Sequence, residues 1–206
     1  MAAPELAADP TSAPPPTMSP PSLSPDDLSV IDALDGGEPR RALALCARLH
    51  GRALGRVCMA LVGSQADAED LAQETLLEAH AAMRTWRREG SLRAFLMTIA
   101  RRKCARHLET RRRRGSKLRL VHDADRTPPS APTERALLTR QRAARTRAAL
   151  STMRPSEREV VLLRYEAGLS FREVAATCGI EETAARKRVS RAVAKLRAAL
   201  AEGDDR

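Results

Sequence analysis

Residues 151–197 read STMRPSEREVVLLRYEAGLSFREVAATCGIEETAARKRVSRAVAKLR, and this stretch carries the clearest structural signals in the chain. Both SERE at 156–159 and SFRE at 170–173 match the capping box. In that motif a Ser at the N-cap and a Glu three residues later each bond the other's backbone at a helix start. The two boxes therefore predict helices near 157–166 and 171–177.

A longer helix is predicted from about residue 182 to 199, after a turn at Gly179, because apolar residues recur there at helical spacing. Its inward positions are Ala185, Val189, Ala192 and Leu196. A short helix, a glycine-containing turn and a longer helix together predict a helix-turn-helix. In proteins that use this motif on DNA, the second helix enters the major groove.

The outward side of that second helix is rich in groups that contact DNA. Arg and Lys can donate to guanine and Glu can accept from cytosine, so the first turns are predicted to face base edges. The residues in question are Glu182, Thr183, Arg186, Lys187 and Ser190. Phosphate contacts are predicted for Arg188, Arg191 and Lys195. The alternative is a plain helical hairpin with a solvated basic face, but the two boxes, the glycine and the basic helix together favour DNA binding.

Upstream, residues 40–115 predict a second group of helices, near 40–62, 66–85 and 91–113. Apolar residues recur every three or four positions in these segments, and Ser91 is a suitable N-cap for the third. Aromatic residues make up only 2% of the chain, so its cores must be aliphatic. Because strong helix formers dominate and no long run alternates β-branched and polar residues, we predict an all-α protein.

The helix from Ser91 is predicted to be a second basic surface. Its candidate contact residues are Arg101, Arg102, Lys103 and Arg106. A basic face is usually just solvated, but the crowding of bases here favours nucleic acid. Trp86, shortly before this helix, could stack on an unpaired base, although a single Trp is as readily part of a core.

A negative row lies on the helix near 66–85, although the whole chain carries a formal net charge of +10. The row consists of Asp67, Asp70, Glu74 and Glu78, three or four residues apart, with Gln73 at its edge. DNA would repel it, and the helix dipole accounts only for the two aspartates near the helix start. A basic protein partner is the simpler explanation for the whole row.

Charge and proline content divide the chain. Residues 1–39 hold no Lys or Arg, seven acidic residues and nine of the thirteen prolines, so they are predicted to be a disordered tail. A TPPSAP run predicts a flexible linker over 116–133. The predicted domains are therefore 40–115 and 134–200, with a short tail at 201–206.

Several classes of protein are not expected. No apolar run reaches the length of about 18 residues that a membrane span requires, and the N-terminus does not resemble a signal peptide. Cys46/His50 and Cys104/His107 have helical spacing, but two buried thiols and two ordinary histidines are a simpler reading than a metal site, so we expect neither metal nor cofactor. No P-loop, nucleophile elbow or HExxH motif occurs, so we expect no enzyme and no small-molecule substrate.

The chain resembles bacterial RNA polymerase sigma factors of the extracytoplasmic-function (ECF) type, which have two folded domains. The matching residues are LVGSQADAEDLAQETLLEAH at 61–80, REGSLRAFLMTIARRKCARHL at 88–108, and the stretch at 151–197. Because both motif sets occur in order, the resemblance is specific. It differs at Glu181–Glu182, where many members have a small cap such as Ser before the recognition helix.

The resemblance implies a role for each surface. The helix of the acidic row would dock on the clamp helices of the polymerase largest subunit, through Asp70, Gln73 and Glu74, with Asp67 and Glu78 extending the contact. The helix from Ser91 would meet the promoter −10 element, and the turn 85–91, with Trp86, would take up a base from the opened strand. The helix-turn-helix would read the −35 element, with Arg172 among its contacts.

The resemblance also implies a cytoplasmic, non-enzymatic subunit that binds core RNA polymerase and promoter DNA and is often held by an anti-sigma factor. A linker over 116–133 can extend to roughly 60 Å, which allows two domains to reach separate promoter elements. The chief alternative is a helix-turn-helix regulator that binds an operator as a dimer. A helical metal-dependent enzyme is a third possibility.

Overall fold

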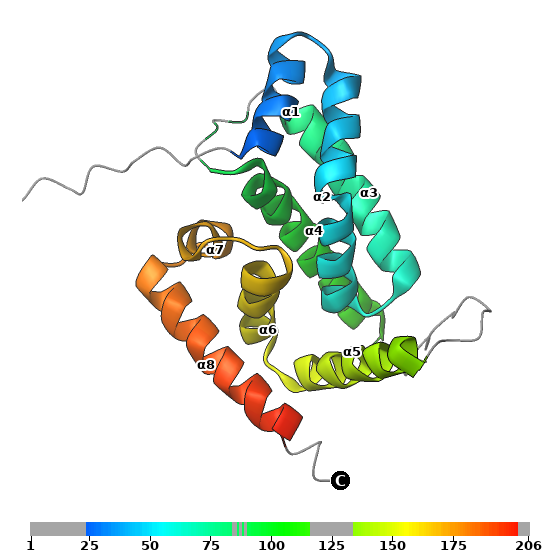
Figure 1. Ribbon diagram of the computed structural model, residues 1–206, viewed down its shortest axis with the longest axis vertical. Helices are drawn as coiled ribbons and strands as arrows, with labels where there is room; N and C mark the ends of the chain where they lie inside the picture. The colour runs from blue at the N-terminus through cyan, green and yellow to red at the C-terminus, as the bar shows by residue number, and fades with distance from the viewer. Residues whose placement is uncertain (1–23, 84–85, 87, 89, 116–133, 202–206) are drawn as a thin grey trace, which may run out of the picture.

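The computed structural model describes residues 24–83, 86, 88, 90–115 and 134–201 (Figure 1). Its elements in chain order are α1 (Pro25–Asp35), α2 (Pro39–Val62), α3 (Gln65–Ala82), α4 (Leu92–Gly115), α5 (Glu134–Thr152), α6 (Pro155–Val161), the π-helical turn η2 (Leu162–Glu166), α7 (Phe171–Cys178) and α8 (Glu182–Ala201). These ranges contain no strand, so the all-α prediction is confirmed. None of their helices is long and apolar enough to cross a membrane. The predicted linker at 116–133 lies outside the described residues.

Helix α1 lies within the segment predicted to be a disordered tail, so that prediction is wrong from Ser24 onward. The Ser24 hydroxyl accepts the Asp27 N–H at 3.1 Å, and the Asp27 carboxylate accepts the Ser24 N–H at 3.4 Å. Pro25 occupies the first helical position, where its missing N–H leaves nothing unsatisfied. This local capping, followed by buried apolar residues such as Val30, outweighs the proline-rich composition of the segment as a whole.

A buried contact between a histidine and a carboxylate holds α1 on α2. Nε2 of His50 lies 3.6 Å from Oδ1 of Asp27, and each side chain is only 2% exposed. Burial raises the pKa of the Asp27 carboxyl, but the neighbouring His50 and the hydrogen bonds with Ser24 outweigh it, so the net pKa lies below the ordinary value of 3.8. Asp27 therefore stays ionised and anchors the first helix.

The two predicted capping boxes have different outcomes. The box at 170–173 is confirmed, since Ser170 Oγ accepts the Glu173 N–H at 3.2 Å and Glu173 accepts the Ser170 N–H at 2.8 Å. The box at 156–159 is absent, because α6 begins at Pro155 with Arg154 as its N-cap and no side-chain cap. Proline at the first helical position fixes the start there instead.

Helices α1 to α4 form one bundle, and α6 to α8 form a second group beside it (Figure 1). The largest core cluster contains residues from both groups, including Leu54 and Met97 from the first and Leu163 and Val174 from the second. Helix α5 packs at its C-terminal end, where Leu150 joins a smaller cluster beside α8. The two units, expected from the sequence to be tethered modules, thus share a continuous apolar core.

Polar contacts also cross between the two groups. Nε of Arg101 on α4 donates to Oε1 of Glu159 on α6 at 2.7 Å, and the hydroxyls of Thr98 and Thr177 lie 3.3 Å apart. The hydroxyl of Ser91, at the start of α4, contacts the Glu173 carboxylate on α7. These contacts place the N-terminal half of α4 against the unit formed by α6 to α8.

Candidate protein- and nucleic-acid-binding surfaces

The acidic row, made of Asp67, Asp70, Glu74 and Glu78, lies on α3. Ser64 begins the helix by accepting the Asp67 N–H at 3.4 Å, and this sets the register of the row. The opposite side of α3 is buried through residues such as Leu71 and Ala79. The row therefore lies on the polar side of an amphipathic helix.

Helix α4 pairs with part of this row, which the sequence did not predict. Asp67 is half-buried, and its Oδ2 lies 3.3 Å from His107 Nε2 and 3.2 Å from Arg111 Nη1. The ammonium of Lys103 lies 3.1 Å from Glu74 and 3.0 Å from Glu78. Burial lowers the pKa of Lys103, but its hydrogen bonds to Glu78 and Glu74 outweigh this and raise the net pKa above its ordinary value.

The outermost part of α3 remains open. Asp70 and Gln73 are exposed, and within the described ranges Asp70 has no ion-pair partner. Leu77 lies beside them, one helical turn beyond Gln73 and Glu74, and is 63% exposed. Leu77 was not among the residues predicted from the sequence. Its helical spacing from Gln73 and Glu74, which puts an apolar residue on the same side as the acidic row, could have identified it. This open face, Asp70, Gln73, Glu74 and Leu77, combines negative charge with an apolar centre.

The basic residues predicted on α4 do not form one surface. Arg101 is turned toward α6, where it pairs with Glu159. Lys103 is turned toward α3, and Nη2 of Arg102 lies 3.9 Å from Glu78. Arg106 is exposed and has no ion-pair partner in the part of the chain that is described. A polyanion can therefore contact Arg106 directly, whereas Arg101 must first break its ion pair with Glu159.

Trp86 precedes α4 and packs on it. Its ring lies 5.6 Å from the Phe95 ring, centre to centre, with 29° between the planes. It also contacts the core cluster beneath. Nearby Arg88 has a positive φ of 56° and pairs with Asp35 at the end of α1. The half-buried Trp86 therefore has the core contact that was one of its two expected roles.

The helix-turn-helix is formed by α7 and α8. Gly179 ends α7 with φ 66°, a left-handed conformation that favours glycine, and its N–H bonds to the carbonyls of Ala175 and Ala176. In α8 the inward residues Ala185, Val189 and Ala192 are at most 2% exposed. The turn and the small inner residues hold the two helices close, and the polar side of α8 is left on the surface.

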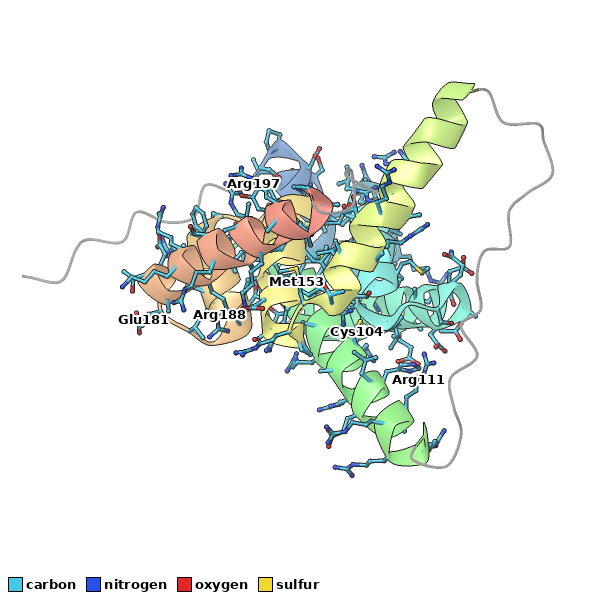
Figure 2. The ribbon with its side chains drawn as sticks, turned by 90° about the horizontal axis from the view of Figure 1, so that it is seen from below. Cys104, Arg111, Met153, Glu181, Arg188 and Arg197 are labelled. Carbon is cyan, nitrogen blue, oxygen red and sulfur yellow. The ribbon has the colours of Figure 1, made fainter. Side chains whose placement is uncertain are left out.

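The polar side of α8 presents the predicted DNA contacts. Five of these residues are exposed on α8: Thr183, Arg186, Lys187, Ser190 and Arg191; Arg172 is exposed on α7. Arg188 is half-buried. Figure 2 shows Arg188 on the half of α8 nearer Glu181, the residue that precedes the helix.

A basic pocket of about 410 Å³ lies between the start of α6 and the side of α8. Its bases are Arg154, Lys187, Arg188 and Arg191. Ser156 and Thr183 add hydroxyl groups to the wall, and Glu157 is the one acid among the described residues that line it. Arg154 was missed by sequence reasoning, and its position just before Pro155 is the signal that could have found it. Such a concentration of positive charge and hydroxyl donors suits a phosphate.

The histidines of the two cysteine–histidine pairs, His50 and His107, each contact a carboxylate. The described residues hold no group of three His, Cys, Asp or Glu side chains that could bind a metal ion. His50 contacts Asp27 and His107 contacts Asp67, so each histidine has a structural partner. Burial raises the pKa of Cys46 to about 12 and that of Cys178 to about 11, so both thiols stay protonated at neutral pH.

Known protein families match both halves of the chain. The family model for Sigma-70 region 2 matches residues 46–114, and that for Sigma-70, region 4 matches residues 143–196. The ECF RNA polymerase sigma factor EcfG of Rhodopseudomonas palustris is 35% identical over 146 residues, which cover 69% of this chain and 76% of that protein. The ECF RNA polymerase sigma factor SigE of Mycolicibacterium smegmatis is 33% identical over 159 residues, covering 75% of this chain and 60% of that protein.

Two solved structures are similar in fold. The sigma factor RpoE of Bartonella quintana, in complex with the anti-sigma factor NepR, superposes with a TM-score of 0.61 and 25% identity over 75% of this chain and 93% of that one. CnrH, in complex with the cytosolic domain of CnrY, superposes with a TM-score of 0.63 and 25% identity over 86% of this chain and 97% of that one.

Proposed function

Because the chain belongs to the ECF group of the sigma-70 family of RNA polymerase sigma factors, we propose that it binds core RNA polymerase, directs it to a set of promoters and helps to open them. The observation that carries the proposal is the segregation of charge. An open acidic face lies on α3 in the region 2 unit, while a basic pocket lies on α8 in the region 4 unit. A protein partner and DNA can therefore bind without competing.

The open face of α3 is the proposed polymerase contact. Asp70, Gln73 and Glu74 would meet basic residues of the clamp helices, with Asp67 and Glu78 at the margin. Charge complementarity of this kind steers association and fixes register. Leu77 would add a desolvated apolar contact at the centre, where binding energy concentrates in interfaces. Glu74 and Glu78, which pair with Lys103, would contribute less to polymerase binding than Asp70.

Helix α4 is the proposed −10 contact. Arg106 and Arg102 are exposed and can meet phosphates directly, while Arg101 would exchange Glu159 for DNA. Lys103 would act mainly by holding Glu74 and Glu78 on α3. Trp86 would have to leave or share its stack on Phe95 in order to receive an extruded base.

Helix α8 is the proposed −35 contact. Thr183, Arg186, Lys187 and Ser190 lie on its exposed side, where the helix can enter the major groove. Arg154, Arg188 and Arg191 line the basic pocket at the side of the helix, where a backbone phosphate would fit. Arg172 on α7 would hold a second phosphate.

The packed arrangement of the two units would have to open on a promoter. Domains 40–115 and 134–200 would separate along the shared core, with residues 116–133 as the connector and 201–206 as a tail. The two similar solved structures contain an anti-sigma factor and the cytosolic domain of CnrY, respectively. We propose that a comparable inhibitor binds this chain and that the protein works in the cytoplasm, where polymerase supplies all the chemistry.

Transcription in vitro tests the proposal. Purified core polymerase is assayed on candidate promoters with and without the full-length protein, and the 5′ ends of the transcripts are mapped. We expect specific start sites only when the protein is present. Core polymerase that gains no specific initiation, together with tight binding of the free protein to a two-fold symmetric site, would favour a dimeric helix-turn-helix regulator instead.

A further inference from the structure

Arg186, on the outer side of α8, is held in one orientation by two neighbours. Its Nε and Nη2 both donate to Oε1 of Glu182, one helical turn earlier, at 3.1 and 2.6 Å. Its guanidinium carbon lies 4.5 Å from the centre of the Phe171 ring on α7. The rotamers of this long side chain are therefore restrained along one edge by Glu182 and over one face by Phe171.

Phe171 is itself firmly placed. It is the first residue of the capped helix α7 and packs against the largest core cluster. A second guanidinium, that of Arg164, lies 4.9 Å from the same ring and donates from Nη1 to the Leu169 carbonyl at 3.0 Å. The ring that supports Arg186 is thus tied to the core and to the segment leading into α7.

The pairing leaves one edge of Arg186 available. A guanidinium has five N–H donors in a planar fork, and Glu182 takes the edge formed by Nε and Nη2. The end formed by Nη1 and the second N–H of Nη2 still offers two parallel donors, on a side chain that is 58% exposed. Those donors match O6 and N7 of guanine in the major groove, whereas adenine presents a donor in place of O6.

We propose that Glu182 and Phe171 are positioning residues that orient Arg186 to read a guanine in the −35 element. In this role Glu182 contacts no base itself, in contrast to the cytosine contact expected from the sequence. Its negative charge also opposes binding to phosphates in general, so Glu182 raises selectivity while lowering affinity for unspecific DNA. The proposal rests on the proposed function, because it assumes that α8 lies in the −35 major groove.

The test uses the full-length protein with core polymerase on a promoter set in which each −35 position carries each of the four bases. With the native chain, one position should prefer guanine by roughly 5- to 150-fold, the discrimination expected of a bidentate pair. Arg186→Ala should abolish the preference at that position and leave the −10 preferences unchanged. Glu182→Ala should remove most of it at the same position, while transcription from the non-guanine promoters stays equal or rises.

Three further variants separate positioning from a general effect of charge or stability. Glu181→Ala removes the same charge from the neighbouring exposed position and should leave every base preference unchanged. Glu182→Gln keeps an acceptor oxygen for Arg186 and should retain part of the guanine preference. Phe171→Leu keeps an apolar side chain but loses the ring face, so it should relax the same −35 position.

Two results would overturn the proposal. If Glu182→Ala changes the preference at a different position from Arg186→Ala, then Glu182 reads a base directly. If it changes no preference, the Glu182–Arg186 pair is an ordinary surface contact. A failure of the proposed function is distinguishable, because no promoter in the set would then be transcribed above the level of core polymerase alone, and both proposals would fall together.

Discussion

Nε of Arg101 on α4 donates to Oε1 of Glu159 on α6 at 2.7 Å, which ties a candidate promoter contact in region 2 to a helix of region 4. The two side chains are 32% and 17% exposed, so the pair is largely shielded from solvent. Binding of DNA phosphates by Arg101 requires this pair to break. In the proposed promoter complex, the contact would therefore couple DNA binding by Arg101 to separation of the two units.

Replacing Glu159 by Gln should favour that separation. A charge-assisted hydrogen bond in a partly buried pair contributes about 1 kcal/mol, so the free protein should bind promoter DNA roughly three- to tenfold more tightly. Fluorescence anisotropy of labelled promoter DNA without polymerase measures this. Glu109→Gln is the control, because it makes the same charge change at an exposed residue paired within α4 to Arg113. Equal affinities for the two variants would show that the pair does not restrain DNA binding.

Charge reversal at Asp70 should disrupt the proposed polymerase contact. Because Asp70 is exposed, Asp70→Lys should change the free energy of unfolding by less than about 0.5 kcal/mol. Like charges at the interface should weaken core polymerase binding at least about tenfold. Biolayer interferometry and urea unfolding provide the two measurements. Asp32→Lys makes the same change at an exposed position of α1 and should bind normally; undiminished binding by Asp70→Lys would refute the assignment of this face.

Leu77→Ser tests the apolar centre of the same face. The side chain is 63% exposed in the free protein, so its loss should not destabilise the fold. If Leu77 is desolvated against polymerase, the variant should bind core about five- to thirtyfold more weakly, the range of a moderate interface residue. The exposed Leu28 of α1, replaced by Ser, is the matched control. Equal effects of the two substitutions would mean that Leu77 is an incidental surface residue.

The parts of the fold that follow from local rules could be predicted from the sequence. The capped start of α7, the left-handed glycine and the inner residues of α8 depend on neighbours within a few positions. Helix α1 was missed because the composition of the proline-rich segment concealed a local capping box at Ser24. The nineteen-residue helix α5 was not foreseen either, since only its last turns, around Leu150, join a described apolar cluster.

The residues of the candidate surfaces were predicted from the sequence, but the side chains of this chain that pair with them were not. Helical spacing placed Asp67, Glu74 and Glu78 in one row, yet it could not show that Lys103 and Arg111 of α4 lie against them. Those contacts depend on how α3 packs on α4, which no local pattern encodes. The same limit applies to Arg101 and Glu159, which are far apart in sequence and meet only because the two units share a core.

The buried Asp27–His50 contact predicts a dependence of stability on pH. The folded pKa of Asp27 lies below 3.8, so the carboxylate stabilises the fold above that pH, and this stabilisation is lost as the pH falls through the folded pKa. At pH 7, Asp27→Asn should lower the free energy of unfolding by about 1–3 kcal/mol and should flatten the decline below pH 3.8. Asp32→Asn, at an exposed position of α1, is the control. The free energy of unfolding is measured by urea unfolding across the acid range. A parallel decline of this free energy in both variants and the native chain would contradict the account.

The central claim is that α3 holds polymerase while α8 holds DNA. Site-specific photo-crosslinking in the complete complex with core polymerase and promoter tests it most directly, with the crosslinking residue placed at Gln73 or at Ser190, both of which are exposed. We predict that Gln73 crosslinks to the largest polymerase subunit and not to DNA, and that Ser190 crosslinks to DNA in the −35 element. A crosslink from Gln73 to DNA, or none from Ser190 to DNA, would contradict the claim.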